Sequence, residues 1–186
     1  EVEVPKNKIE LTIETFKKYH LIGMMTSMFN NRLTELTKNP ESSLIYGYNY
    51  PGSWVRGVDG FNVGTGVKPG MIEQGLEEML VELERVLRFG FTESEFERQK
   101  RADLKAIEME YNERDKTESE KLRWGFLDLF FENRTIIGIE KKYEITNELI
   151  PTLKVSDLNE YINKIKFSKI KVITINCPDN EGDAIP

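Results

Sequence analysis

The strongest structural signal in this sequence is a joint between two helices, in the stretch RFGFTESE at residues 88–95. Gly90 stands where the first helix is expected to end, because helices commonly end at a residue with positive φ, which glycine adopts without a Cβ penalty. Thr92 and Glu95 have the spacing of a capping box, which opens a new helix. The sequence therefore predicts two long helices joined by a tight turn.

Apolar residues recur every three or four positions in segments on both sides of this joint, and that spacing is typical of helices with one core-facing stripe. We expect helices over residues 16–37 with Thr15 as N-cap, over about 70–89 after Pro69-Gly70, and from Thr92 to about Asp115. Shorter helices are expected within 117–150 and from the cap Ser156 to Lys164. The predicted stripes are Ile22, Met25, Phe29, Leu33 and Leu36; Ile72, Leu76, Met79, Leu80, Leu83 and Leu87; and Phe96, Leu104, Ile107 and Tyr111.

Three segments have the composition of β-strands, since aromatic and β-branched residues dominate them. Residues 44–50 and 60–67 are expected to pair antiparallel, and residues 169–176 to form a further strand. Alternation would place Leu44, Tyr46, Tyr48 and Tyr50 on one face of the first strand, and Phe61, Val63, Thr65 and Val67 on one face of the second. Residues 9–13 allow a strand remnant at best, and residues 179–186 are expected to be a disordered tail.

Size and composition favour one α+β domain over residues 1–186, an antiparallel sheet packed by long helices, because 186 residues with 39% hydrophobic content suit a single core. The net charge of −6 opposes a general affinity for nucleic acid. No segment approaches the roughly 20 apolar residues that span a bilayer. The chain begins at Glu1 without a secretion signal, so we read it as a piece of a longer protein, and both cytoplasm and periplasm stay open as its location.

Few residues qualify as catalytic or metal-binding groups. His20 is the only histidine, which rules out a site built on a histidine pair, and Cys177 is the only cysteine. A lone histidine on a helix is more often a surface or partly packed side chain, and nothing in the spacing brings His20 to Cys177. The sequence therefore predicts no catalytic, metal-binding or cofactor-binding residue within this chain.

Three further stretches have some features of a binding site. Residues 64–70 are glycine-rich between a strand and a helix, but Pro69 lacks an N–H for a phosphate, so a plain connection is favoured. The carboxylates of residues 93–118 alternate with Arg and Lys, as on a solvated helix face. The tyrosines at 46, 48 and 50 with Trp54 would suit a peptide groove, although core packing is the favoured role.

Three motifs in order resemble the insulinase/pitrilysin family of zinc metallopeptidases. Residues 28–36 (MFNNRLTEL) look like the family's Phe-x-x-Arg-Leu-x-Glu-Leu helix. Residues 69–101 look like its helix pair, with the Arg-Val and Gly-Phe-Thr-x-x-Glu elements at the joint. Residues 147–158 look like its Leu-x-x-Ile-Thr-x-x-Asp-Leu turn. The resemblance covers nearly the whole chain.

The resemblance implies one α+β domain of a pitrilysin or mitochondrial-processing-peptidase-like metallohydrolase. In that family the first domain carries His-x-x-Glu-His, which is absent here, and zinc would therefore be held outside this chain. The fourth domain carries an Arg and a Tyr where this chain has Thr37 and Leu44, which favours a second domain.

On this reading the chain is a non-catalytic domain, inactive alone, of a zinc metalloendopeptidase that encloses peptides or unfolded protein. Its expected partner is the adjacent catalytic domain of the same chain or a partner subunit. Two alternatives remain: a catalytically dead subunit of the same fold that binds substrate or scaffolds a complex, and an unrelated peptide-binding module.

Overall fold

The structure is a computed structural model that describes residues 12–55, 58–116, 123, 137–166 and 172–176. Its helices and single antiparallel sheet confirm the predicted α+β class. The chain divides into two compact units, Glu1–Gly23 with Thr92–Val155, and Met24–Phe91 with Ser156–Pro186, and helix α1 (Ile13–Thr37) contributes to both. No helix in the described ranges is long and apolar enough to cross a membrane.

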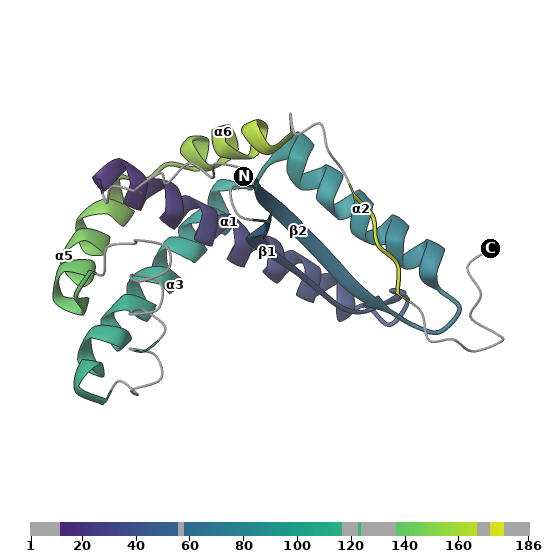
Figure 1. Ribbon diagram of the computed structural model, residues 1–186, viewed down its shortest axis with the longest axis horizontal. Coiled ribbons are helices and arrows are strands. Elements are labelled where there is room, and N and C mark those ends of the chain that lie inside the picture. The colour runs from purple at the N-terminus through teal and green to yellow at the C-terminus, as the bar shows by residue number, and fades with distance from the viewer. Residues whose placement is uncertain (1–11, 56–57, 117–122, 124–136, 167–171, 177–186) are drawn as a thin grey trace, which may run out of the picture. The chain divides into compact units, whose positions relative to one another are not determined.

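The unit of residues 24–91 and 156–186 is built on a long twisted hairpin of β1 (Leu44–Val55) and β2 (Val58–Val67) (Figure 1). The two strands pair antiparallel, as predicted, and both run longer than the sequence pattern indicated. Leu44 pairs with Val67 while Tyr46 pairs with Gly66, so Ile45 is an extra residue in β1. Such a bulge shifts the alternation of side chains along the strand.

Helix α1 covers one face of this hairpin. Phe29 and Leu33 are fully buried; Phe29 stacks on Phe61 with ring centroids 6.1 Å apart, and Leu33 packs against Gly47. Asn30 accepts a hydrogen bond from the backbone N–H of Asn49 at 2.7 Å. The central part of the predicted α1 stripe is therefore confirmed as core, together with neighbouring apolar residues of the same helix, Met24, Met25 and Met28.

The opposite face of the hairpin carries Tyr46, Tyr48 and Tyr50, which are 55%, 45% and 50% exposed. The prediction that these tyrosines pack in the core is wrong. The extra residue Ile45 places Leu44 on the buried face and Tyr46 on the exposed one, so the four residues do not share a face as strict alternation predicted.

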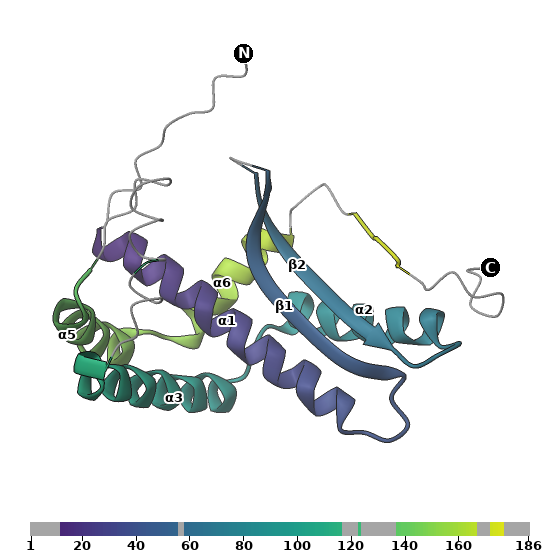
Figure 2. The same cartoon turned by 60° about the horizontal axis from the view of Figure 1, so that its bottom comes forward.

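Helix α2 (Ile72–Phe89) lies beside β2 (Figure 2) and buries a different face from the one its sequence predicted. The buried residues of α2 are Gly75, Glu82 and Val86, and Glu78 bonds to the start of β1. The predicted apolar stripe is centred roughly 100° around the helix axis from these residues. Its members are only partly buried, and Leu80 is 38% exposed. The predicted stripe is therefore not the core face of this unit.

The end of α2 is held by contacts from α1 and from α6 (Val155–Lys166). Gly90 has φ 67° and ψ −151°, and its N–H donates to the carbonyl of Val86, which confirms it as the helix end. Asn159 of α6 accepts a hydrogen bond from the N–H of Phe91 at 3.0 Å and donates to its carbonyl at 3.3 Å. The amide side chain of Asn159 thus bonds to both backbone groups of Phe91, within the joint.

Arg32 of α1 makes the second set of contacts at this joint. Its guanidinium lies 3.3 Å from the carboxylate of Glu82, donates to the Gly90 carbonyl, and stacks 4.8 Å from the ring centroid of Phe91. The Glu82 side chain is only 5% exposed and also accepts from Arg85 at 2.8 Å. A nearly buried carboxylate is therefore compensated by two arginines.

The unit of residues 1–23 and 92–155 contains α3 (Glu93–Asn112), the short 3₁₀ turns η1 (Arg114–Lys116) and η2 (Ile150–Thr152), and α5 (Ile139–Leu149). The capping box is confirmed: Thr92 accepts from the N–H of Glu95, whose carboxylate accepts from the N–H of Thr92 at 2.8 Å. Tyr111 of α3 stacks on Tyr143 of α5 with centroids 4.4 Å apart. Phe96 and Ile107 are buried as predicted, whereas Leu104 and Tyr111 are partly buried.

Several predicted boundaries differ from the structure. Helix α1 begins at Ile13, before the predicted start at residue 16. The residue whose hydroxyl accepts a hydrogen bond from an early N–H of the helix is Thr12 and not the predicted N-cap Thr15. The N–H that donates this bond is that of Thr15. Helix α6 begins at Val155, one residue before the predicted cap Ser156. Of the predicted strand 169–176, residues 172–176 have no regular secondary structure, and the rest lies outside the described residues. Of the predicted strand remnant at residues 9–13, Ile13 instead begins α1 and Thr12 has no regular secondary structure, so this part of the prediction is wrong. Residues 9–11 and the predicted tail at residues 179–186 lie outside the described residues.

Candidate functional site

His20 lies on α1 within the first unit and is partly buried. Its ring stacks on Phe16, and its Nε2 lies 3.3 Å from Oδ2 of Asp103, whose other oxygen accepts a hydrogen bond from Gln99. These contacts are typical of a partly packed histidine, which is one of the roles that the sequence favours for His20. Cys177 lies outside the described residues. Among the side chains that the structure does describe, no group of three or more His, Cys, Asp or Glu is placed to hold a metal ion.

The acidic residues of α3 have the surroundings of a solvated helix face. Glu97 pairs with Lys100 at 2.8 Å, and Glu110 pairs with Lys142 of α5 at 2.7 Å. The side chains of both pairs remain partly exposed. Both carboxylates are therefore neutralised by a lysine, as on a solvated helix face.

The glycine-rich stretch before α2 forms the plain connection that the sequence favoured. Gly64 and Gly66 belong to β2, and Gly70 adopts φ 73° in the turn that leads to α2. The N–H of Lys68 donates to the carbonyl of Ser43, and its ammonium group donates to the carbonyl of Pro40. Both donors of Lys68 are therefore used within the protein.

The start of β1 is fastened to α2 through one carboxylate. Glu78 accepts hydrogen bonds from the hydroxyl of Ser42 at 2.6 Å and from the N–H and hydroxyl of Ser43 at 2.9 and 2.8 Å. Burial alone would raise the pKa of Glu78, but these hydrogen bonds and the nearby Lys68 together lower it. The cluster fixes the position of α2 on the hairpin and leaves no free group for chemistry.

The first candidate binding surface is a ladder of three stacked rings, here called the tyrosine ladder: Tyr46, Tyr48 and Tyr50. Their centroids are 6.2 and 6.1 Å apart, with interplanar angles of 17° and 18°. Glycines on β2 make room for the rings, because a Cβ at Gly64 would lie 2.6 Å from the Tyr48 ring and one at Gly66 would overlap the Tyr46 ring. The ladder is therefore an exposed aromatic surface whose position the hairpin itself fixes.

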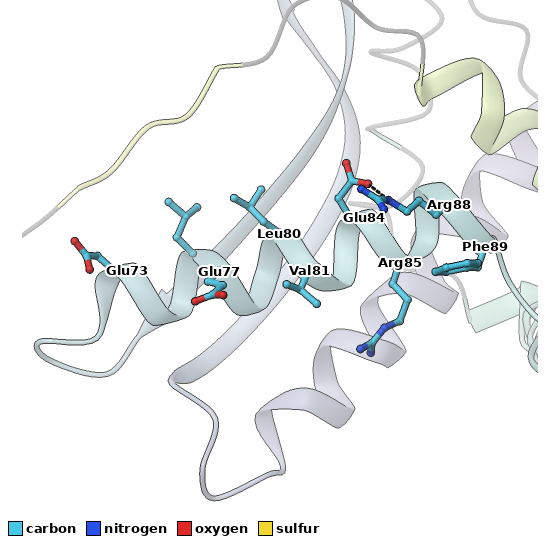
Figure 3. A pocket seen from close by; sticks show the side chains of 9 residues that line it. Glu73, Glu77, Leu80, Val81, Glu84, Arg85, Arg88 and Phe89 are labelled. Carbon is cyan, nitrogen blue, oxygen red and sulfur yellow. Dashed lines mark hydrogen bonds and ion pairs between the residues drawn. The ribbon is translucent and has the colours of Figure 1, made fainter.

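The second candidate surface is the outer side of α2, here called the α2 surface (Figure 3). It is a shallow depression of about 640 Å³ in which apolar side chains lie between charged ones. Arg88 pairs with Glu84 across it at 2.7 Å, and Phe89 at its end is 79% exposed. The residues lining the α2 surface are Glu73, Leu76, Glu77, Leu80, Val81, Glu84, Arg85, Arg88 and Phe89.

The fold is that of one domain of an insulinase-type protease, and the comparisons with known proteins confirm the resemblance to this class of zinc peptidases. No protein-family model matches the chain. The "Zinc protease PQQL-like" protein of Arabidopsis thaliana is 32% identical to it over 84 residues, which are 45% of this chain and 9% of that protein.

Solved structures match over most of the chain. The first half of the periplasmic protease PqqL from Escherichia coli superposes with a TM-score of 0.76 and 15% identity, over 83% of this chain and 33% of that one. The longer structure of the same protease gives the same score over 84% of this chain and 17% of that one. A predicted insulinase family protease from Yersinia pestis has a TM-score of 0.66 and 10% identity, and this chain spans 33% of it.

Sequence reasoning missed two residues that hold the joint after α2, Arg32 and Asn159. Arg32 and Asn159 lie far from the joint in sequence, and nothing in their local pattern indicates contact with it. The tyrosine ladder had a readable signal, since glycines alternate on β2 opposite the tyrosines and leave room for large rings. No such sequence signal marks the apolar stripe of α2 as half-exposed, because a helix has the same apolar spacing whether the partner of its stripe lies inside or outside the chain.

Proposed function

We propose that this chain is a non-catalytic domain of a zinc metalloendopeptidase and forms part of a chamber that encloses peptide substrates. The observation that carries the proposal is the similarity to a named zinc protease, supported by the match of the fold to one domain of PqqL. Residues 1–186 act as a single domain, the second of the N-terminal half, within a longer protein that we call the parent. The 9–33% share of its relatives that this chain spans fits that role.

Zinc belongs to another part of the parent on this proposal. A zinc peptidase site needs several nitrogen, sulfur or oxygen ligands, commonly two histidines, whereas this chain contains one histidine and that ring packs on Phe16 beside Asp103. Bound elsewhere in the parent, zinc would activate water for attack on the peptide carbonyl. The contribution of this domain is to bind and enclose the peptide, and alone it is inactive.

The tyrosine ladder is the surface that suits contact with a peptide. Stacked, half-exposed rings offer apolar area and hydroxyl groups without a preference for one sequence. The hairpin fixes their orientation in advance, so little ordering is needed when a peptide binds. We therefore assign the ladder to the inner wall of the chamber.

Replacing Tyr48 by alanine in the parent is expected to raise KM for peptides about 3-fold to 10-fold, the loss of one aromatic contact. The zinc content and kcat should not change, because on this proposal zinc and its ligands belong to another part of the parent. The matched control is Tyr19→Ala, since Tyr19 is similarly exposed at 49% but lies outside the ladder. Steady-state kinetics with a fluorogenic peptide measure the effect. An unchanged KM, or an equal rise in the control, would remove the ladder from the wall.

A further inference from the structure

The tyrosine ladder occupies one face of the hairpin, and its neighbours on that face are small. Residues that pair directly across two strands point to the same face. The partners of the three tyrosines on β2 are Gly66, Gly64 and Asn62. The opposite face is the one that packs on α1, through contacts such as those of Gly47 and Phe61. The three rings are therefore the main side chains that the exposed face of the hairpin presents.

The strands that carry this face contain no charge in the region of the ladder. Neither residues 44–55 nor residues 60–67 include Asp, Glu, Lys or Arg. A charged side chain of a ligand that came to lie over the rings would lose water and gain no opposite charge from these strands, which costs free energy. The ladder therefore favours ligand side chains that are uncharged and apolar.

The distances between the rings match the repeat of an extended peptide. The centroids are 6.2 and 6.1 Å apart, so the ladder has two nearly equal steps. In an extended chain, side chains on one side recur every second residue, which is about 6.6 Å, or less where the strand is twisted. An extended peptide can therefore place successive side chains of one face against successive rings.

Other regular peptide conformations match the ladder less well. The side chains of one helical stripe, at i, i+4 and i+7, are about 6.0 and 4.5 Å apart along the axis. Two equal helical steps of about 6.0 Å, at i, i+4 and i+8, point about 80° apart around the helix. In polyproline II the repeat is about 9.3 Å. The spacing of the rings thus favours the extended chain.

Glycines of β2 fix this spacing in the hairpin itself. A Cβ at Gly64 would lie 2.6 Å from the Tyr48 ring, and one at Gly66 would overlap the Tyr46 ring, so both rings lie over glycines. The planes of neighbouring rings differ by only 17° and 18°. Because the row of rings is ordered before any ligand arrives, a matching peptide binds without the cost of arranging it.

From these observations we infer that the tyrosine ladder binds extended peptide segments with uncharged, apolar side chains at every second position. Three such side chains, within five residues of the peptide, each lie against one ring. The ladder recognises the spacing of the apolar residues and not their identity, since any apolar side chain can pack on a ring. The inference rests on the proposed function in one respect, that the ligand of this surface is a peptide.

Binding of matched peptides to the parent tests this inference without an activity assay. Three labelled peptides have the same composition, three leucines among serine and glutamine. The leucines stand at i, i+2 and i+4 in the first peptide, at i, i+4 and i+7 in the second, and in one block in the third. Fluorescence anisotropy gives each Kd, with a chelator present so that a zinc peptidase does not cleave the peptides. The alternating peptide is expected to bind about 3-fold to 10-fold tighter than the others, a difference of one ring contact.

Three variants locate the preference on the ladder. Tyr48→Ala removes the central ring and should bring the three Kd values to within about 2-fold of one another. The matched control Tyr48→Phe keeps the ring and should keep the preference. Gly64→Ala retains all three rings but displaces that of Tyr48, and should weaken the preference because the spacing changes.

Several results would overturn the inference. Equal Kd values for the three peptides would mean that the ladder does not recognise spacing, even in a parent that cleaves peptides. A preference that survives Tyr48→Ala would belong to another part of the parent. Tighter binding of the alternating peptide with arginine in place of leucine would replace apolar packing by cation–π contacts. A change of oligomeric state in Tyr48→Ala, with unchanged Kd values, would make a second copy the occupant. Conversely, an alternating preference that depends on Tyr48 supports the inference even if the parent proves to be inactive.

Discussion

Replacing Gly90 by valine is expected to lower the free energy of unfolding by about 3 kcal/mol, because φ 67° with ψ −151° is a conformation essentially restricted to glycine. A side chain there also meets a second obstacle, since a Cβ would overlap the amide oxygen of Asn159. That oxygen already accepts the hydrogen bond from Phe91 and is not free to move away. Chemical denaturation of the variant measures the loss.

Two further variants separate these causes. Gly23→Ala is the control for glycine replacement in general, because Gly23 is helical and exposed with open space around its Cα; it should gain about 0.5–1 kcal/mol. Gly90→Val combined with Asn159→Ala removes the overlap but keeps the unfavourable φ. If Gly90→Val alone costs no more than an ordinary surface substitution, the described geometry of the joint is wrong.

Replacing Arg32 by leucine is expected to cost about 3 kcal/mol, because it leaves the nearly buried carboxylate of Glu82 with only the exposed Arg85 as a partner. The same change removes the hydrogen bond to the Gly90 carbonyl and the stacking on Phe91. Arg32→Leu should therefore loosen the joint as well as destabilise the unit. Urea denaturation measures the lower stability of the unit, and amide exchange at residues 90–92 measures the loosening of the joint.

A double variant identifies the physical origin of this loss. If the cost comes from an uncompensated charge, Arg32→Leu with Glu82→Leu should be more stable than Arg32→Leu alone. The control is Arg88→Leu, which breaks an exposed pair with Glu84 and should cost no more than about 0.5 kcal/mol. Equal losses for Arg32→Leu and Arg88→Leu would contradict the buried network.

The parts of the fold that sequence predicts well are those whose signals are local. The joint is an example, because the positive φ of Gly90 and the capping box of Thr92 and Glu95 involve neighbours within a few residues. The central α1 stripe and the antiparallel hairpin belong to the same group, since each depends on one repeated spacing. The family motifs follow these same elements, which explains why the resemblance and the structure agree.

The parts that sequence mispredicts depend on distant residues or on one inserted residue. The extra residue Ile45 places the tyrosine side chains on the face of β1 opposite to that of Leu44. The alternation of apolar residues in the sequence does not reveal where such a bulge lies. The apolar stripe of α2 was expected in the core of this chain, yet the residues that pack there are Glu82 and Val86 because Arg32 compensates the charge. Both errors affect the candidate surfaces more than the fold.

The tyrosine ladder suits the proposed wall of a chamber. Its rings stack on one another, and glycines of β2 leave room for them, so the hairpin itself keeps this surface in shape as different peptides bind.

Peptide hydrolysis with bound zinc assayed in parallel, on the parent and on residues 1–186 alone, tests the central claim most directly. The account predicts zinc and chelator-sensitive hydrolysis in the parent, beside a zinc-free and inactive chain of 186 residues. A parent that binds peptide but neither holds zinc nor cleaves would contradict the claim in favour of a catalytically dead subunit. Zinc held stoichiometrically by residues 1–186 would contradict the assignment of the metal to another domain.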